Sequence, residues 1–88
     1  MSLWYLYMVR SKDGSLYTGI TQDVPKRFAQ HQAQGAQCAK YLKGRAPLEL
    51  VYQEQVGDKS QALRREYAVK KLPKTAKEQM ALMPKNFS

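Results

Sequence analysis

A short polar turn separates two tyrosine-rich apolar segments near the start of the chain. The turn contains Asp13-Gly14, a strong signal for a tight β-hairpin. The segments on either side, residues 3–9 and 16–20, are rich in the aromatic and β-branched residues that favour strands. The sequence therefore predicts two antiparallel strands joined by the turn.

Helix signals follow the predicted hairpin. Asp23 is a candidate N-cap residue, and Pro25 is tolerated in the first turn of a helix. A glycine commonly ends a helix, and Gly35 lies at a suitable distance downstream. These residues predict a helix over about residues 24–34.

One strand and two helices are predicted in the second half of the chain. The residue pair Asp58 and Gln61 has the spacing of a capping box, and Pro73 closes the helix that the box begins. The predicted elements are a strand at residues 48–52, in a region that Gly57 ends, a helix at 59–72 and a short helix at 75–83. The expected fold is α+β, with a three-stranded antiparallel sheet flanked by helices in the order ββαβαα. We expect one domain over residues 1–83 and a C-terminal tail at 84–88.

Basic residues outnumber acidic ones by 15 to 7, which gives a formal charge of +8. Residues 24–48 contain five bases and no acid, and residues 59–77 contain seven bases and one acid. Such clustering favours a nucleic-acid partner, with phosphate contacts expected from Lys26, Lys40, Lys43, Arg45 and Lys70. A solvated charged face, or a surface that binds an acidic protein, stays open as an alternative.

The apolar residues, Cys38 and His31 limit which locations and which covalent or metal sites are possible. The longest apolar run, residues 3–9, is too short to span a bilayer, and no leader-like segment is recognised, so a cytoplasmic location is expected. Cys38 is the single cysteine and His31 the single histidine, which excludes an intrachain disulfide and a Cys/His zinc cluster. Any metal ion is therefore expected to bind through oxygen atoms.

Glu66 falls within the apolar stripe of the helix predicted at residues 59–72. On a helical wheel it lies near Ala62 and Val69. A carboxylate in that position needs an ion pair, hydrogen bonds or a bound cation to offset the loss of water. A salt bridge to a neighbouring base and a metal site are both open at this point.

A wider pattern links the hairpin tyrosines to the two helices. Tyr5 and Tyr7 precede Tyr17 and Gly19, then Arg27 and His31 follow four residues apart, and Glu66 comes last. This pattern resembles the GIY-YIG nuclease superfamily over nearly the whole chain. In size and basic character the chain is similar to the small stand-alone bacterial members, which are related to the catalytic domain of an excinuclease. Two departures are that Tyr5 replaces the opening glycine and that Ile20 stands where several relatives have lysine.

The resemblance implies a divalent-metal-dependent endonuclease. By this resemblance, Tyr7 is the general base that activates water, and Tyr17 and His31 shape the hydrogen bonds of that tyrosine. Arg27 binds the phosphate, and Glu66 binds one Mg²⁺ or Mn²⁺ ion. Gly19 would allow substrate and backbone to approach closely. The expected substrate is branched, flapped or nicked DNA in repair or recombination, and RNA stays open as an alternative. The protein is expected to be a monomer or weak dimer, and a partner protein can supply its specificity.

Less specific alternatives remain for the same residues. The tyrosines can serve only as packing, Gly19 can be an ordinary strand-end glycine, and His31 can lie on the helix surface. For the whole chain, the main alternative is a DNA- or RNA-binding module that uses the basic groove without cleaving its ligand. A domain that binds an acidic protein is the third hypothesis.

Overall fold

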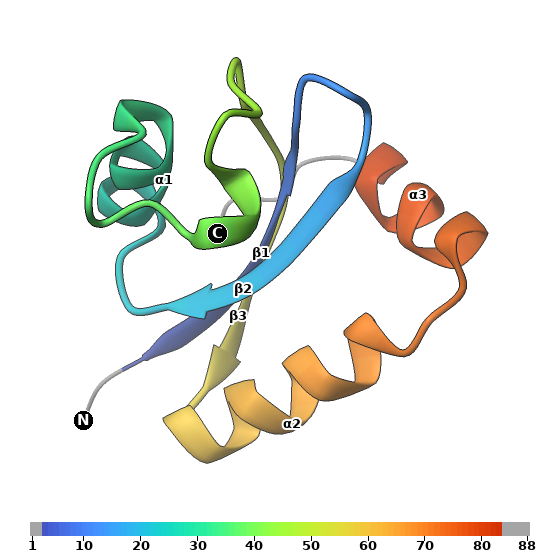
Figure 1. The fold of residues 1–88 in the computed structure, drawn as a ribbon. Coiled ribbons are helices and arrows are strands. Elements are labelled where there is room, and N and C mark those ends of the chain that lie inside the picture. The colour runs from blue at the N-terminus through green and yellow to red at the C-terminus, as the bar shows by residue number, and fades with distance from the viewer. Residues whose placement is uncertain (1–2, 84–88) are drawn as a thin grey trace.

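The computed structural model describes residues 3–83 and contains a three-stranded antiparallel sheet with the order β2-β1-β3 (Figure 1). The strands are β1 (Trp4–Arg10), β2 (Leu16–Thr21) and β3 (Glu49–Gly57). The hairpin formed by β1 and β2 confirms the prediction made from Asp13-Gly14. The tail predicted at residues 84–88 lies outside the described residues.

The central strand β1 is buried on both faces. Tyr7 and Val9 belong to one core cluster, whereas Leu6 and Met8 are buried on the opposite face, as the alternation of a strand requires. In the register of the hairpin, Tyr7 lies opposite Gly19 and Val9 opposite Tyr17. Tyr7 and Tyr17 therefore project from the same face of the sheet.

Helices cover both faces of the sheet (Figure 1). On one side lie α1 (Val24–Ala33) and the 3₁₀ helix η1 (Lys40–Leu42), and on the other lie α2 (Lys59–Lys70) and α3 (Lys74–Leu82). The order confirms the predicted ββαβαα architecture, to which η1 is an addition. Within residues 3–83, no helix is both long enough and apolar enough to cross a bilayer.

The end of α1 differs in detail from the prediction. The left-handed residue that ends the helix is Gln34, with a φ of 60°, and not Gly35. The side-chain amide of Gln34 donates to the carbonyl oxygens of His31 and Leu42, and its oxygen accepts from the Gly44 N–H. These bonds offset the steric cost of positive φ in a residue with a Cβ.

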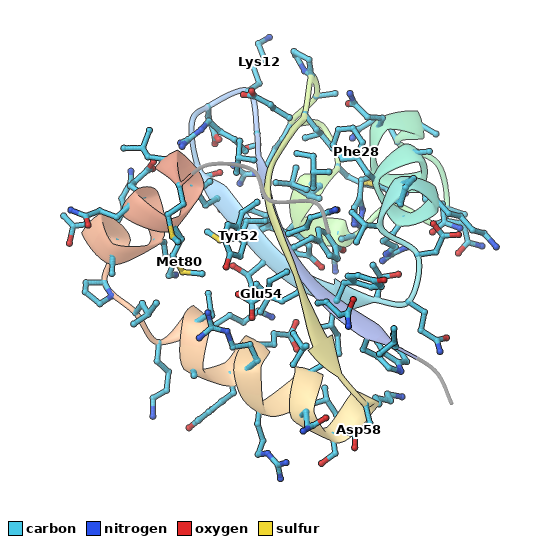
Figure 2. The ribbon with its side chains drawn as sticks, turned by 180° about the vertical axis from the view of Figure 1, so that it is seen from behind. Lys12, Phe28, Tyr52, Glu54, Asp58 and Met80 are labelled. Carbon is cyan, nitrogen blue, oxygen red and sulfur yellow. The ribbon has the colours of Figure 1, made fainter. Side chains whose placement is uncertain are left out.

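Strand β3 continues five residues beyond the apolar segment predicted at residues 48–52, through to Gly57. Its second half is polar, but it stays paired with β1, and Glu54 accepts two hydrogen bonds from Arg65 of α2 at 2.7 and 3.0 Å. Figure 2 shows Tyr52 and Glu54 on the side of β3 that faces the two C-terminal helices. The extension therefore depends on partners far away in sequence.

Candidate active site at the edge of strand β2

Three aromatic rings from three elements form the centre of the site. Tyr7 comes from β1, Tyr17 from β2 and His31 from α1. The ring centroids are 6.3 Å apart for the two tyrosines, 5.9 Å for Tyr7 and His31, and 5.6 Å for Tyr17 and His31. The structure thus brings together three of the residues that the sequence selected as candidates.

The hydrogen bonds of His31 fix its tautomer. The Ala39 N–H donates to Nδ1 at 3.2 Å, so Nδ1 carries no proton. In the neutral ring the proton is then on Nε2, which lies 2.8 Å from the Tyr7 hydroxyl oxygen. His31 therefore donates to Tyr7, and this bond stabilises negative charge on the phenol oxygen.

His31 is fully buried, so the interpretation of this residue as a helix-surface group is wrong. Burial, together with the nearby charge of Arg27, lowers the pKa of His31 to about 4. The ring is thus neutral at physiological pH, in agreement with its hydrogen bonds. It acts as a donor and not as a cationic group.

Burial also dominates the chemistry of Tyr7, of which 1% is exposed. Loss of water raises the pKa of Tyr7 well above its usual value of about 10, and the neighbouring Tyr17 raises the pKa further. The nearby Arg27 guanidinium lowers this pKa, but by less than burial raises it. Tyr7 is therefore a neutral phenol here, whereas half-buried Tyr17 is accessible to solvent.

Gly19 provides the space that the Tyr7 ring occupies. A Cβ built on Gly19 would lie 2.7 Å from the Tyr7 hydroxyl oxygen and 2.8 Å from Cζ, closer than real Cβ atoms approach. Tyr5, from the same motif, packs against the core cluster, and Ile20 lines a hollow beside α1. Gly19 thus has a specific steric role in the arrangement of the motif.

Arg27 extends from α1 towards this cluster. Its Nη1 donates to the Gln37 carbonyl oxygen at 2.7 Å and to Gln30 at 3.0 Å. These bonds hold the guanidinium near Tyr7 and His31, where its charge lowers both pKa values. Arg27 also lines a hollow of about 360 Å³ that is open to solvent, so a phosphate can reach it.

Sequence reasoning missed Tyr41 as a member of the aromatic cluster. Its ring stacks on Tyr17 with a centroid distance of 5.9 Å, and the Arg45 guanidinium lies 4.7 Å from the centroid of the Tyr41 ring. Tyr41 lies in η1, and 45% of the residue is exposed. Its position depends on the folded loop, and the only signal in the sequence is an aromatic residue among bases.

Glu66 lies in α2, which covers the face of the sheet opposite α1 (Figure 1). Ala62 and Val69 are fully buried, and 20% of the Glu66 side chain is exposed, which confirms the predicted acid in an apolar stripe. Glu66 forms an ion pair with Lys70 at 3.3 Å, so the salt bridge left open by the sequence is present. Lys70 is exposed, and such a pair contributes little stability.

The two faces meet in a hollow of about 500 Å³ at the β2 edge. Tyr17 and Tyr41 line it from one side, and Lys70 of α2 and Lys77 of α3 line it from the other. Glu66 lies one helical turn before Lys70 and is joined to this hollow through the ion pair. Tyr17 therefore lines the same hollow as Lys70, the ion-pair partner of Glu66.

The donor set fits a loosely held hard cation. Within residues 3–83, His, Cys, Asp and Glu side chains form no group of three or more that could hold a metal ion. Glu66 alone can offer one carboxylate, and Mg²⁺ characteristically binds through one or two carboxylates with water and substrate oxygens. The residues thus fit a Mg²⁺-like ion completed by substrate, and not a closed protein cage.

The predicted phosphate-contacting bases are distributed around the two hollows and the η1 loop. Lys26, Lys40 and Lys43 are exposed, and Lys26 lines the same hollow as Arg27. Lys70 is paired with Glu66, and Arg45 is paired with Asp13. Their contacts with nucleic acid stay a prediction.

Comparison with known proteins identifies the family. A model of the GIY-YIG catalytic domain matches residues 3–79. The chain belongs to the GIY-YIG family. This family is part of a nuclease superfamily, and GIY-YIG nucleases generally depend on divalent metal ions.

Individual GIY-YIG relatives are similar over most of their length. UPF0213 protein SG0387 of Sodalis glossinidius is 53% identical over 77 residues, covering 88% of this chain and 70% of that protein. UPF0213 protein YhbQ of Salmonella arizonae is 47% identical over 87 residues, covering 99% and 85%. The solution NMR structure of UPF0213 protein BH0048 from Bacillus halodurans has a TM-score of 0.59 and 39% identity, covering 97% of this chain and 88% of that one. These names specify no activity.

Proposed function

We propose that this protein is a divalent-metal-dependent endonuclease that hydrolyses phosphodiester bonds in DNA. The observation that carries the proposal is the cluster of Tyr7, Tyr17 and His31 beside a hollow that is also lined by Lys70, the ion-pair partner of Glu66. Family membership and the formal charge of +8 support a nucleic-acid substrate. We further propose that the substrate is branched, flapped or nicked DNA, that the process is repair or recombination, and that the protein is cytoplasmic.

In the proposed reaction, water attacks the phosphorus and the bond to the 3′ oxygen breaks. Tyr17 is the phenol that solvent can reach, so we assign the contact with the attacking water to Tyr17 and not to the buried Tyr7, which the resemblance implied as general base. Tyr7 and His31 lie behind it and hold the hydrogen-bond chain, with His31 donating to Tyr7. The attacking water loses one proton and the departing 3′ oxygen gains one, so the overall reaction neither consumes nor releases a proton at these two atoms.

Positive charge is needed in two places during this reaction. Arg27 lines a solvent-open hollow and can bind the non-bridging phosphate oxygens as negative charge develops on them. Glu66 and substrate oxygens would hold the divalent ion, which when bound would supply positive charge that stabilises the departing oxygen. Lys70, the partner of Glu66, would then be released towards the substrate.

Cleavage by matched variants tests the proposal. Purified protein is incubated with flapped, branched and nicked DNA in Mg²⁺ or Mn²⁺, and Tyr17→Phe and Glu66→Gln are expected to lower the rate by at least about 100-fold. Tyr67→Phe and Glu49→Gln are controls because both residues are exposed and lie outside the site. Absence of cleavage by the natural sequence with either metal would leave the non-catalytic binding module as the better hypothesis. Undiminished cleavage by Glu66→Gln would refute the assigned site.

A further inference from the structure

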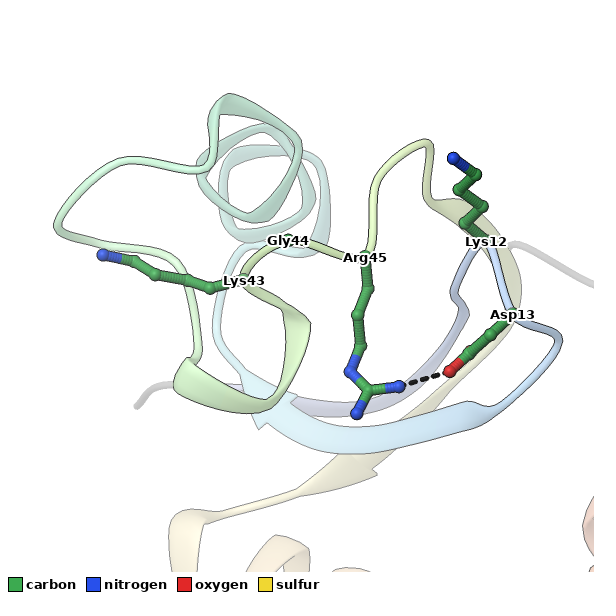
Figure 3. Close-up of a pocket in the computed structure, with 5 residues that line it drawn as sticks. All are labelled: Lys12, Asp13, Lys43, Gly44 and Arg45. Carbon is green, nitrogen blue, oxygen red and sulfur yellow. Dashed lines mark hydrogen bonds and ion pairs between the residues drawn. The ribbon is translucent and has the colours of Figure 1, made fainter.

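A third hollow, which is basic, lies beside the aromatic site, and the proposed reaction above gives it no role. It has a volume of about 520 Å³, and Figure 3 shows its lining residues, Lys12, Asp13, Lys43, Gly44 and Arg45. These residues come from the β1–β2 turn and from the segment that follows η1. The Lys12 N–H donates to the Arg45 carbonyl oxygen at 2.8 Å, so the two segments are joined at this hollow.

The charge of the hollow is positive. Three bases, Lys12, Lys43 and Arg45, and one acid line the hollow. The acid, Asp13, forms an ion pair with Arg45, while the Lys12 and Lys43 side chains point away from this pair (Figure 3). Within residues 3–83, neither Lys12 nor Lys43 forms an ion pair, and both are exposed. Two ammonium groups are therefore available to an anionic ligand.

Asp13 is fixed as a negative charge at this position. Its Oδ1 accepts from the Ser11 hydroxyl at 2.5 Å, the Ser15 hydroxyl at 2.8 Å and the Ser15 N–H at 3.1 Å. These hydrogen bonds lower the pKa of Asp13, so the carboxylate stays ionised and close to Arg45. An incoming anion must compete with Asp13 for the Arg45 guanidinium.

Arg45 connects the hollow with the aromatic site. Its guanidinium lies over the Tyr41 ring, and Tyr41 lines the catalytic hollow together with Tyr17. A DNA strand that places a phosphate beside Tyr17 would therefore pass Tyr41 and Arg45 before reaching Lys12 and Lys43. Tyr41 lies on this path and 45% of the residue is exposed, while its ring packs against Tyr17 and the Arg45 guanidinium.

Resting on the proposed function, we propose that the Lys12–Lys43 hollow binds the phosphodiester backbone of single-stranded DNA flanking the cleaved bond, and that Asp13 weakens this binding. The strand enters the catalytic hollow past Tyr41, and its flanking phosphates contact Lys12, Lys43 and Arg45. The Asp13 carboxylate acts as a competing internal anion. Binding therefore requires exchange of Asp13 for a phosphate at Arg45.

The test measures affinity without cleavage. Fluorescence anisotropy follows a labelled oligothymidylate of about 12 nucleotides in the presence of a chelator. For single strands, each phosphate contact contributes about −0.7 to the slope of log affinity against log salt concentration. One contact is therefore worth about fivefold in affinity at 0.1 M salt relative to 1 M salt. Lys12→Ala and Lys43→Ala should each weaken binding by about fivefold and reduce the salt slope, whereas Asp13→Asn should tighten binding severalfold.

Lys71→Ala is the matched control, since Lys71 is exposed and its ammonium donates to Tyr67, outside this hollow. Its effect should stay below about twofold, and circular dichroism should show all variants folded. Equal losses for Lys12→Ala, Lys43→Ala and Lys71→Ala would overturn the site, as would unchanged or weaker binding by Asp13→Asn. Cleavage of DNA by a protein that does not bind the oligothymidylate would overturn this inference while the proposed function stands.

Discussion

Replacement of Gly19 by alanine tests the packing on which the aromatic site depends. The added Cβ would lie 2.7, 2.8 and 3.1 Å from three atoms of the Tyr7 side chain. Tyr7 is 1% exposed and cannot swing into solvent without losing its core contacts. The substitution should therefore displace the phenol and break its 2.8 Å hydrogen bond with His31.

The magnitude follows from two contributions. Overpacking of a closely packed interior costs about 1–3 kcal/mol, and a buried hydrogen-bonding group left without a partner costs about 1–3 kcal/mol. Allowing for partial relaxation of the Tyr7 ring, we expect Gly19→Ala to lower the free energy of unfolding by about 2–4 kcal/mol. This is a large part of the stability of a small domain.

Urea denaturation followed by far-UV circular dichroism measures this loss. Gly35→Ala is the matched control, because a Cβ at Gly35 would have no atom within 4 Å and its φ lies outside the positive range. In a Tyr7→Phe background the cost of Gly19→Ala should fall by about 1 kcal/mol, since the hydrogen bond is already absent. Equal stabilities for Gly19→Ala and Gly35→Ala would refute the steric argument.

Three further predictions concern His31, Glu54 and Tyr41. The pKa of His31 is about 4 in the folded protein against about 6.5 in the unfolded chain. The unfolded chain therefore binds the extra proton between these values, and stability should fall by about 2–3 kcal/mol from pH 7 to pH 4. Comparison of urea midpoints with His31→Gln isolates this contribution, and parallel pH profiles would contradict it. Glu54→Gln should lower the free energy of unfolding by about 1–2 kcal/mol in the same assay, because it loses charge-assisted bonds to Arg65. The control Glu49→Gln, at an exposed residue, should lower it by less than about 0.5 kcal/mol. Equal losses would contradict the role of the ion pair. Tyr41→Ala should lower the cleavage rate about tenfold by removing the ring that stacks on Tyr17, while Tyr41→Phe should retain the rate; a rate unchanged in Tyr41→Ala would contradict this packing role.

Local signals account for much of the fold. Asp13-Gly14 predicted the hairpin, and the Asp58 and Gln61 pair predicted the start of α2, where both bonds of the capping box are present. The helical period placed Glu66 between Ala62 and Val69 on the inner face of α2. These features depend on residues that are close in sequence, so a sequence pattern is sufficient to predict them.

Other features depend on partners that local patterns do not contain. The polar half of β3 is held by pairing with β1 and by Arg65 of α2, and the left-handed Gln34 is held by Leu42 and Gly44. The same is true of the aromatic site. The Nδ1 atom of buried His31 accepts its hydrogen bond from the Ala39 N–H in the following loop. Tyr41 joins the site because the fold places its ring against Tyr17 of β2.

The most direct test of the central claim is the position of a bound metal ion. A crystal soaked with Mn²⁺ and measured by anomalous scattering should show a peak beside the Glu66 carboxylate, facing the hollow lined by Tyr17, and Glu66→Gln should abolish this peak. An ordered Mn²⁺ elsewhere, with Glu66 still paired to Lys70, would contradict the account.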